Sequence, residues 1–142
     1  MSTSTTFADV AEGVRATLAA YAHALDDGRT DDVVATFVPD GTCQIPGMGT
    51  LSGHEELRAA YAKWTPRRPQ RHVVVNTHVT DWDDHQAAAT SDVLFLLLGE
   101  AGWSIQLVGR YDDTLALVQG EWRFRHRSAT FVTEPVPTEG TP

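Results

Sequence analysis

Carboxylate side chains gather where the first helical pattern of the chain ends. The segment YAHALDDGRTDD (residues 21–32) carries an apolar helical stripe up to Asp26 and Asp27, followed by a glycine and two further aspartates. The C-terminal end of a helix favours cations, so acid at this end opposes the helix dipole. On a helical wheel Asp26 falls at the edge of the apolar face, whereas Asp27 lies toward solvent. Asp26 is therefore either an ordinary surface aspartate or a carboxylate that serves a partner across a pocket.

A histidine that could act as a general base opens the segment RHVVVNTHVTDW. Histidine suits this role because it titrates near working pH. His72 alternates in phase with Val74, Asn76 and His78, but alternation does not decide which face is the inner one. His78 is roughly 20 Å further along a strand, so the two histidines cannot share one metal ion. No other His, Cys or Asp spacing matches a zinc or 2-His-1-carboxylate site, and we predict no metal.

Other polar and aromatic residues are candidates for a pocket wall. Tyr21 lies on the apolar helical face and is either a core tyrosine or a hydroxyl donor to a leaving group. Asn76 shares the phase of His72, and Asp92 precedes the apolar run VLFLLL, where it is either a wall residue or a strand-edge residue. Trp64 and Phe95 are expected to line the pocket or the core. The two acids in GRYDD are interpreted as a bulge or turn feature, and as a weaker site candidate than Asp26.

Two residues near the C-terminus compete for one inward position. Strict alternation places Arg127 with Arg123 and Arg125 on a solvated face, and places His126 with Trp122 on the other face. A bulge after EWRF would reverse this phase. Either Arg127 or His126 therefore enters the pocket.

Composition narrows the class of protein. The 142 residues fit a single domain, expected over residues 1–133, and 42% of them are hydrophobic, enough for a core. The net charge of −8 argues against nucleic acid and against anionic membranes. The N-terminus has neither the basic nor the apolar region of a signal peptide, which favours the cytoplasm. Residues 134–142 are rich in Pro, Thr and Gly and are expected to form a flexible tail.

The residue pattern divides the chain into a helical half and a strand half. Apolar residues at helical spacing predict a first helix over residues 10–25. Thr30 is the expected N-cap of a short second helix that runs through Phe37 and ends before the turn at residues 39–41. A small hairpin follows, and a capping box of Ser52 and Glu55 predicts a third helix to about Trp64.

Four long segments rich in β-branched and aromatic residues follow, at residues 71–82, 86–98, 103–118 and 121–132. Tight connections separate them, so they predict the strands of an antiparallel meander. Strands of this length must curl in a domain this small, with bulges that assist the curvature. The expected fold is α+β, with a cone-shaped, mainly antiparallel sheet wrapped around three N-terminal helices.

Four pieces of the chain carry a resemblance to a known family: YAHALDDGRTDDVVATFVPDG, GTLSGHEEL, QRHVVVNT and GRYDDTLALVQGEWRFRHR. Their order and spacing resemble the SnoaL-like branch of the nuclear transport factor 2-like superfamily. The resemblance implies a cystatin-like α+β barrel with a deep apolar pocket. The site pattern is most similar to that of bile acid dehydratase, hexachlorocyclohexane dehydrochlorinase and scytalone dehydratase.

The resemblance assigns roles to four positions. It implies that Asp26 orients His72, which acts as the base, and that Tyr21 and Arg127 complete the catalytic set. Asn76, Asp92, His126, Trp64 and Phe95 are the expected substrate-binding residues. The implied function is a lyase of the dehydratase type that acts on a hydrophobic ring-containing substrate. An isomerase or polyketide-type cyclase with the same pair, or a non-enzymatic binding or assembly module, is the alternative.

No cofactor is expected, because acid–base elimination needs none and the chain has no Gly-rich phosphate loop. The net charge of −8 argues against a nucleic-acid or membrane partner. A homo-oligomer is expected, because the convex sheet face would expose many apolar side chains. The resemblance favours a trimer over a dimer. The side chains expected on that face are Val73, Val75, Val79, Ile105 and Leu107, together with either Leu94, Leu96 and Leu98 or the residues that alternate with them.

Overall fold

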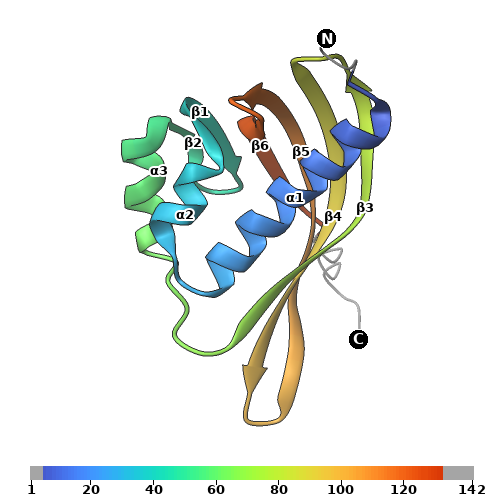
Figure 1. Ribbon diagram of the computed structural model, residues 1–142. Helices are drawn as coiled ribbons and strands as arrows, with labels where there is room; N and C mark the ends of the chain where they lie inside the picture. The colour runs from blue at the N-terminus through green and yellow to red at the C-terminus, as the bar shows by residue number, and fades with distance from the viewer. Residues whose placement is uncertain (1–4, 133–142) are drawn as a thin grey trace, which may run out of the picture.

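Three helices lie against one face of a curved sheet. The computed structural model describes residues 5–132, so the tail expected at residues 134–142 lies outside the described residues. Helix α1 (Phe7–Asp26) crosses the concave face of the sheet, while α2 (Thr30–Ala35) and α3 (Gly53–Ala62) stand beside its β1–β2 edge (Figure 1). None of the helices within the described residues is long and apolar enough to cross a membrane.

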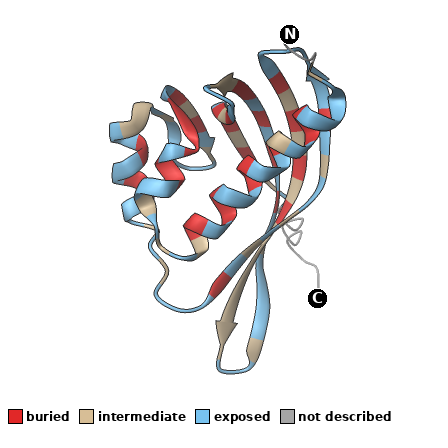
Figure 2. Cartoon of the chain, viewed as in Figure 1, coloured by how far each residue is buried: buried red, intermediate tan, exposed pale blue. Residues whose placement is uncertain are grey.

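Helix α1 forms because its start is capped and one of its faces is apolar. The Thr6 side chain accepts from the backbone N–H of Asp9, and the Asp9 side chain accepts from the backbone N–H of Thr6. This reciprocal capping box satisfies two N–H groups that a helix start otherwise leaves unpaired. The expected inward stripe is confirmed as buried and packs on the sheet (Figure 2): Val10, Val14, Leu18, Tyr21 and Leu25.

One predicted helix cap lacks its hydrogen bonds and another is displaced by one residue. Ser52 precedes α3 but its side chain makes no capping hydrogen bond; instead its backbone N–H donates to Glu56 Oε1 at 3.4 Å. Arg29, rather than Thr30, is the N-cap residue of α2, again without a side-chain bond. Phe37 begins a strand instead of ending a helix, because its backbone pairs with Phe124.

The sheet has six strands in the order β2-β1-β6-β5-β4-β3 and does not close into a full barrel. All neighbours are antiparallel except β1 and β6, which run parallel. The α+β prediction with a mainly antiparallel, curved sheet is therefore confirmed. The β4–β5 hairpin projects well beyond the helices (Figure 1). The strand bounds are β1 Phe37–Ile45, β2 Gly49–Ser52, β3 Gln70–Trp82, β4 Gln86–Gly99, β5 Gly102–Val118 and β6 Glu121–Phe131.

Bulges decide which side chains face the helices. In β3 an extra residue lies between the pairs Val75–Asp92 and His78–Thr90, and Asn76 there has φ 56°. The bulge reverses the alternation of β3, so Val79 is buried in the core rather than exposed on the convex face. Leu107, opposite Phe95, lines the concave side. The expectation that Val79 and Leu107 belong to the convex face is therefore wrong.

A second bulge sets the inward face of the last strand. In β6 the partner of Leu115 is Phe124 and the partner of Thr114 is His126, so Arg125 is the extra residue. Phe124 and Arg127, three positions apart, are both fully buried. The bulge expected after EWRF is thus confirmed, and it brings Arg127 to the concave side of the sheet.

Candidate active site

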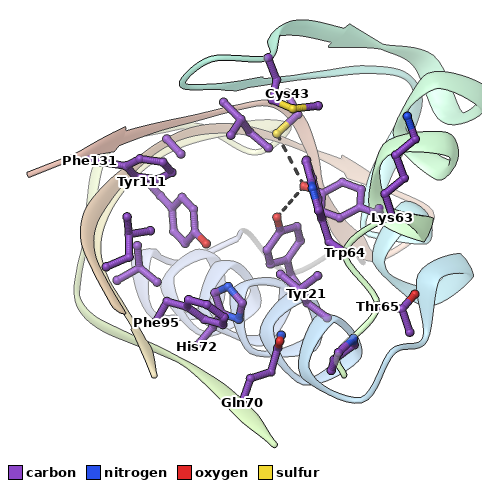
Figure 3. Close-up of a pocket in the computed structure, with 18 of the residues that line it drawn as sticks. Tyr21, Cys43, Lys63, Trp64, Thr65, Gln70, His72, Phe95, Tyr111 and Phe131 are labelled. Carbon is purple, nitrogen blue, oxygen red and sulfur yellow. Dashed lines mark hydrogen bonds between the residues drawn. The ribbon is translucent and has the colours of Figure 1, made fainter. Parts of the chain in front are cut away.

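A cavity of about 650 Å³ opens between the concave face of the sheet and the helices. Most of its wall is apolar or aromatic, and it includes the predicted pocket residues Trp64 and Phe95. Figure 3 shows Tyr111 and Phe131 on one side of the space and Trp64 on the opposite side. Such a space suits a compact apolar ligand held by a few polar groups.

Asp26 and His72 meet at one wall of this cavity. Nδ1 of His72 lies 2.7 Å from Oδ1 of Asp26, and the backbone N–H of His72 donates to Oδ2 at 2.8 Å. Gln70 Nε2 donates to Oδ1 at 3.2 Å. The expected approach of Asp26 and His72 within hydrogen-bonding distance is confirmed. Three donors therefore fix the carboxylate that ends helix α1.

The environment keeps Asp26 ionised. Only 5% of its side chain is exposed. Burial raises the pKa of Asp26, but the hydrogen bonds from the ring and backbone of His72 and from Gln70 outweigh it, so the pKa lies below its ordinary value. A carboxylate only accepts hydrogen bonds, so Nδ1 of His72 carries the proton. In the neutral ring Nε2 is then the nitrogen with a free lone pair.

The His72 ring lines the cavity and packs against Phe95, with ring centroids 4.7 Å apart. Figure 3 shows the two rings side by side at the floor of the cavity, above Gln70. The strand pairing explains this contact, because His72 of β3 lies directly opposite Phe95 of β4. The imidazole is therefore held by Asp26 on one side and by an aromatic ring on the other.

Arg127 is a buried cation at the cavity wall. Its Nε and Nη2 donate to the two carboxylate oxygens of Asp113 at 2.9 and 3.2 Å. Burial alone would lower the pKa of Arg127, but the Asp113 carboxyl, followed by Tyr111 and Tyr21, raises it above the ordinary value. Arg127 Nη1 is buried and has no hydrogen-bond partner within the described residues. This N–H group can serve an oxygen atom of a bound ligand.

Aromatic rings surround the guanidinium. Its Cζ lies 3.5 Å from the ring centroid of Tyr111, 4.3 Å from that of Tyr21 and 4.4 Å from that of Phe124. Cation–π contacts of this kind stabilise a desolvated arginine. They also fix the plane of the guanidinium, which is therefore preorganised before any ligand binds.

Tyr21 is part of a short chain of hydroxyl and thiol groups. Its Oη lies 2.5 Å from Oη of Tyr61, which lies 3.6 Å from Sγ of Cys43, as the dashed lines in Figure 3 indicate. Burial raises the pKa of both Tyr21 and Tyr61 well above the ordinary value. Both phenols are therefore neutral near pH 7 and can donate hydrogen bonds.

Three expected substrate-binding residues do not reach the cavity. The bulge in β3 turns Asn76 outward, where it donates to Asp92 Oδ2 at 2.9 Å. Asp92 alternates with the inward-facing Val93 and points to the convex side, where Arg110 also binds it. His126 lies on that side too, with Nδ1 2.5 Å from Thr42 Oγ1. The prediction that Asn76, Asp92 and His126 line the pocket is wrong.

Sequence reasoning missed several residues of the site. Asp113 holds Arg127, although its sequence pattern made it only a weaker site candidate than Asp26 and a bulge or turn residue. Its alternation with Tyr111 and Leu115, which are also buried, is a signal that could have found it. Gln70 and Tyr61 carried no such signal, because their roles depend on contacts with α1. The described residues contain no group of three or more His, Cys, Asp or Glu that could hold a metal ion.

With the fold and this geometry in hand, comparison with known proteins defines the class. The family model described as a SnoaL-like domain matches residues 8–128. The chain therefore belongs to the SnoaL-like family, as the residue pattern led us to expect. A search of curated protein sequences found no match.

Several solved structures share the fold. An NTF2-like protein with a cystatin-like fold from Novosphingobium aromaticivorans is 18% identical, with a TM-score of 0.77 over 92% of this chain and 82% of that one. A proposed scytalone dehydratase from the same organism is 21% identical, with a TM-score of 0.76 over 92% and 93%. A Mycobacterium tuberculosis protein of unknown function is 22% identical, with a TM-score of 0.79 over 85% and 70%. At these identities the similarity shows the fold alone.

Proposed function

We propose that this SnoaL-like protein is a cofactor-independent lyase of the dehydratase type, acting on a hydrophobic, ring-containing substrate. The observation that carries the proposal is the Asp26–His72 pair, joined at 2.7 Å on the wall of a cavity that Arg127 also lines. A base, a residue that orients it and a cation for a developing oxyanion are the groups that proton abstraction next to a carbonyl requires.

The base in this mechanism is His72. Nε2 of the neutral ring takes a proton from the carbon next to the substrate carbonyl. The electron pair of that C–H bond forms the new carbon–carbon double bond as the C–O bond to the hydroxyl group breaks. Asp26 stabilises the imidazolium that results, as a buried carboxylate does in other histidine-based sites.

Arg127 and Tyr21 serve the oxygen atoms of the substrate. The unpaired Nη1–H of Arg127 donates to the carbonyl oxygen, which becomes negative in the transition state. The departing hydroxide takes its proton from the imidazolium of His72 or from the neutral phenol of Tyr21, and leaves as water. When the imidazolium supplies the proton, His72 returns to its neutral state at once. A proton taken from Tyr21 is replaced from the imidazolium.

The shape and lining of the cavity support the substrate class. Aromatic and aliphatic side chains dominate the wall, and they bury an apolar ring system without leaving polar groups unpaired. The proposed scytalone dehydratase among the similar structures agrees with this class, although it supports the assignment only as an analogy of fold.

A second candidate function is an isomerase or cyclase that uses the same pair. The hydroxyls of Tyr21 and Tyr61 are hydrogen-bonded to each other, which reduces their availability to a leaving group. An isomerase needs no leaving-group acid, because His72 returns the proton to another carbon. The hydrogen bond between Tyr21 and Tyr61 therefore supports the isomerase or cyclase as the second candidate.

A test common to both candidates measures proton abstraction itself. In D2O, NMR would follow deuterium incorporation next to the carbonyl of 2-tetralone, and water loss from a ring ketone with a β-hydroxyl group. We expect the wild-type protein to catalyse exchange. His72→Gln and Asp26→Asn should each lower the rate about 10²–10⁴-fold, the usual contribution of a positioned general base.

The matched control is His78→Gln, which alters an exposed histidine on the same strand. It should leave exchange unchanged. Elimination by the wild type would assign a lyase, and exchange without elimination would assign an isomerase or cyclase. Absence of both reactions, or equal rates in the wild type and His72→Gln, would refute the acid–base proposal and favour a non-enzymatic binding module.

A further inference from the structure

The cavity is lined by charges of the sign opposite to that of the protein. The chain has 19 acidic and 11 Lys or Arg residues. Among the described residues that line the cavity, however, none is Asp or Glu, while four are Lys or Arg: Lys63, Arg67, Arg68 and Arg127. The cavity lining therefore differs in charge from the chain as a whole. The excess of positively charged residues around the cavity therefore favours a negatively charged ligand.

The cation deep in the site is paired, whereas the cations near the entrance are not. Arg127 is neutralised by Asp113 at 2.9 Å, and the Asp26 carboxylate accepts hydrogen bonds from His72 and Gln70. Lys63, Arg67 and Arg68 are exposed, and none of them takes part in an ion pair within the described part of the chain. These three cations, the rim cluster, are therefore the unpaired positive charges of the cavity.

The segment that carries the rim cluster is held in place. Pro66 and Pro69 flank the two arginines and restrict the backbone. The Thr65 hydroxyl donates to the carbonyl of Ala62 at 3.0 Å, and the backbone N–H of Leu98 donates to the carbonyl of Pro69 at 3.0 Å. The loop between α3 and β3 is therefore tied to both the helix and the sheet. The backbone that carries the two arginines is therefore fixed beside the cavity.

We propose that the natural ligand carries an anionic group, a carboxylate or a phosphate, and that Lys63, Arg67 and Arg68 bind this group at the cavity rim. The ligand is then amphipathic, with an apolar ring body inside and an anion at the entrance. Arginine pairs well with either oxyanion because its N–H groups match their geometry. This inference rests on the proposed function only in treating the cavity as the substrate site.

The test uses two fluorescent probes that differ in one charged group. 8-Anilinonaphthalene-1-sulfonate and N-phenyl-1-naphthylamine share a ring system, but only the first carries an anion. We expect the wild-type protein to bind the sulfonate roughly tenfold more tightly at low salt, the combined effect of three partly solvated ion pairs. This preference should fall as salt is added, because salt screens exposed charges.

The triple variant Lys63→Gln/Arg67→Gln/Arg68→Gln should bind both probes equally, with unchanged affinity for the neutral probe as the sign that the cavity is intact. A matched variant removes three exposed cations elsewhere, Arg15→Gln/Arg110→Gln/Arg125→Gln, and should retain the preference. Equal binding of the two probes by the wild type would overturn the proposal. So would a preference that survives in the rim variant, which would assign the anion to Arg127.

Competition identifies the anion. Naphthalene-2-carboxylate or 2-naphthyl phosphate should displace the sulfonate probe better than the neutral naphthalene-2-carboxamide. The anionic competitor that binds more tightly indicates whether the natural ligand carries a carboxylate or a phosphate. If neither surpasses the amide, the rim cluster does not select anions. His72→Gln should keep the preference for the sulfonate. The rim proposal and the catalytic proposal can therefore fail independently.

Discussion

Strand β5 contributes to two arginine–aspartate pairs, one on each face of the sheet. On the concave face Asp113 of β5 holds Arg127 with N–O distances of 2.9 and 3.2 Å. On the convex face Arg110 of β5 holds Asp92 at 2.9 Å. Both are arginine–aspartate pairs, and the shortest N–O distance is 2.9 Å in each. The exposure differs, because the side chains are 1% and 0% exposed in the first pair and 57% and 30% exposed in the second.

The comparison shows that the surroundings, rather than the contact, give an ion pair its role. Water solvates Arg110 and Asp92, so each side chain can separate from the other at little cost. Water cannot solvate Arg127 and Asp113 in the same way, because both side chains are buried and aromatic rings enclose the guanidinium. Loss of either partner would leave a desolvated charge. The concave pair therefore acts as a rigid unit at the cavity wall, in which Nη1 of Arg127 has no hydrogen-bond partner within the described residues.

The largest expected effect is a loss of protein stability when the concave Arg127–Asp113 pair is broken. Arg127→Met removes a buried cation and leaves Asp113 unpaired, which should lower the free energy of unfolding by about 3–5 kcal/mol. Urea denaturation would measure this change. Arg110→Met is the matched control on the convex face and should be indistinguishable from the wild type. A loss in Arg127→Met no greater than in Arg110→Met would contradict the distinction between the two faces.

The double variant Arg127→Met/Asp113→Leu sharpens the same comparison. Replacing both charges by apolar side chains removes the desolvation penalty, so about 2 kcal/mol or more of the lost stability should return. The deuterium exchange assay should remain slow in this variant, because the oxyanion has lost its donor. If stability stayed as low as in the single variant, packing of the guanidinium rather than its charge would explain the loss.

A smaller effect is expected at Asp26, and it should depend on pH. The pKa of Asp26 is lowered by folding, so its contribution to stability is complete above the ordinary value near 3.9 and disappears as the pH falls through the folded-state value. At pH 7, Asp26→Asn should lower the free energy of unfolding by about 1–3 kcal/mol, since it removes charged hydrogen bonds. The difference from the wild type should shrink below about pH 4.

Urea titrations between pH 7 and pH 3 would follow this difference. Asp27→Asn supplies the control, because the neighbouring carboxylate is 57% exposed and its one ionic partner among residues 5–132 is the exposed Arg29. A difference between Asp26→Asn and the wild type that stayed constant over this range would show that the ionised form of Asp26 is not what stabilises the fold.

Substitutions on the convex face should have the smallest effect on the stability of the folded chain. We expect this face to form the interface of a homo-oligomer, and we favour a trimer over a dimer. Several apolar side chains are exposed there, with Ile105 at 60%, Val108 at 40%, Val75 at 39% and Val73 at 37%. Ile105→Glu should weaken association without changing the unfolding of the monomer, because Glu can remain solvated at an exposed position. Light scattering at micromolar concentration would measure both proteins. A wild-type monomer would refute the oligomer.

Residue patterns determined much of this fold because helical and strand periodicity are local properties. The stripe from Val10 to Leu25 defines the buried face of α1. The same stripe places Asp26 at the edge of that face, next to the cavity. The four long strands and the tight turns between them also follow from neighbouring residues. The pairing of Asp26 with His72 was expected only through the resemblance to a family, since 46 positions separate the two residues.

Only the tertiary structure decided which strand residues face the cavity. Alternation predicts two faces but not their phase, and a bulge resets the phase wherever strand pairing accommodates an extra residue. The bulge at Asn76 turned that residue outward, and the one at Arg125 turned Arg127 inward and left His126 on the convex side. The same pairing set Asp113 beside Arg127. These positions depend on partners in neighbouring strands, which a local residue pattern does not contain.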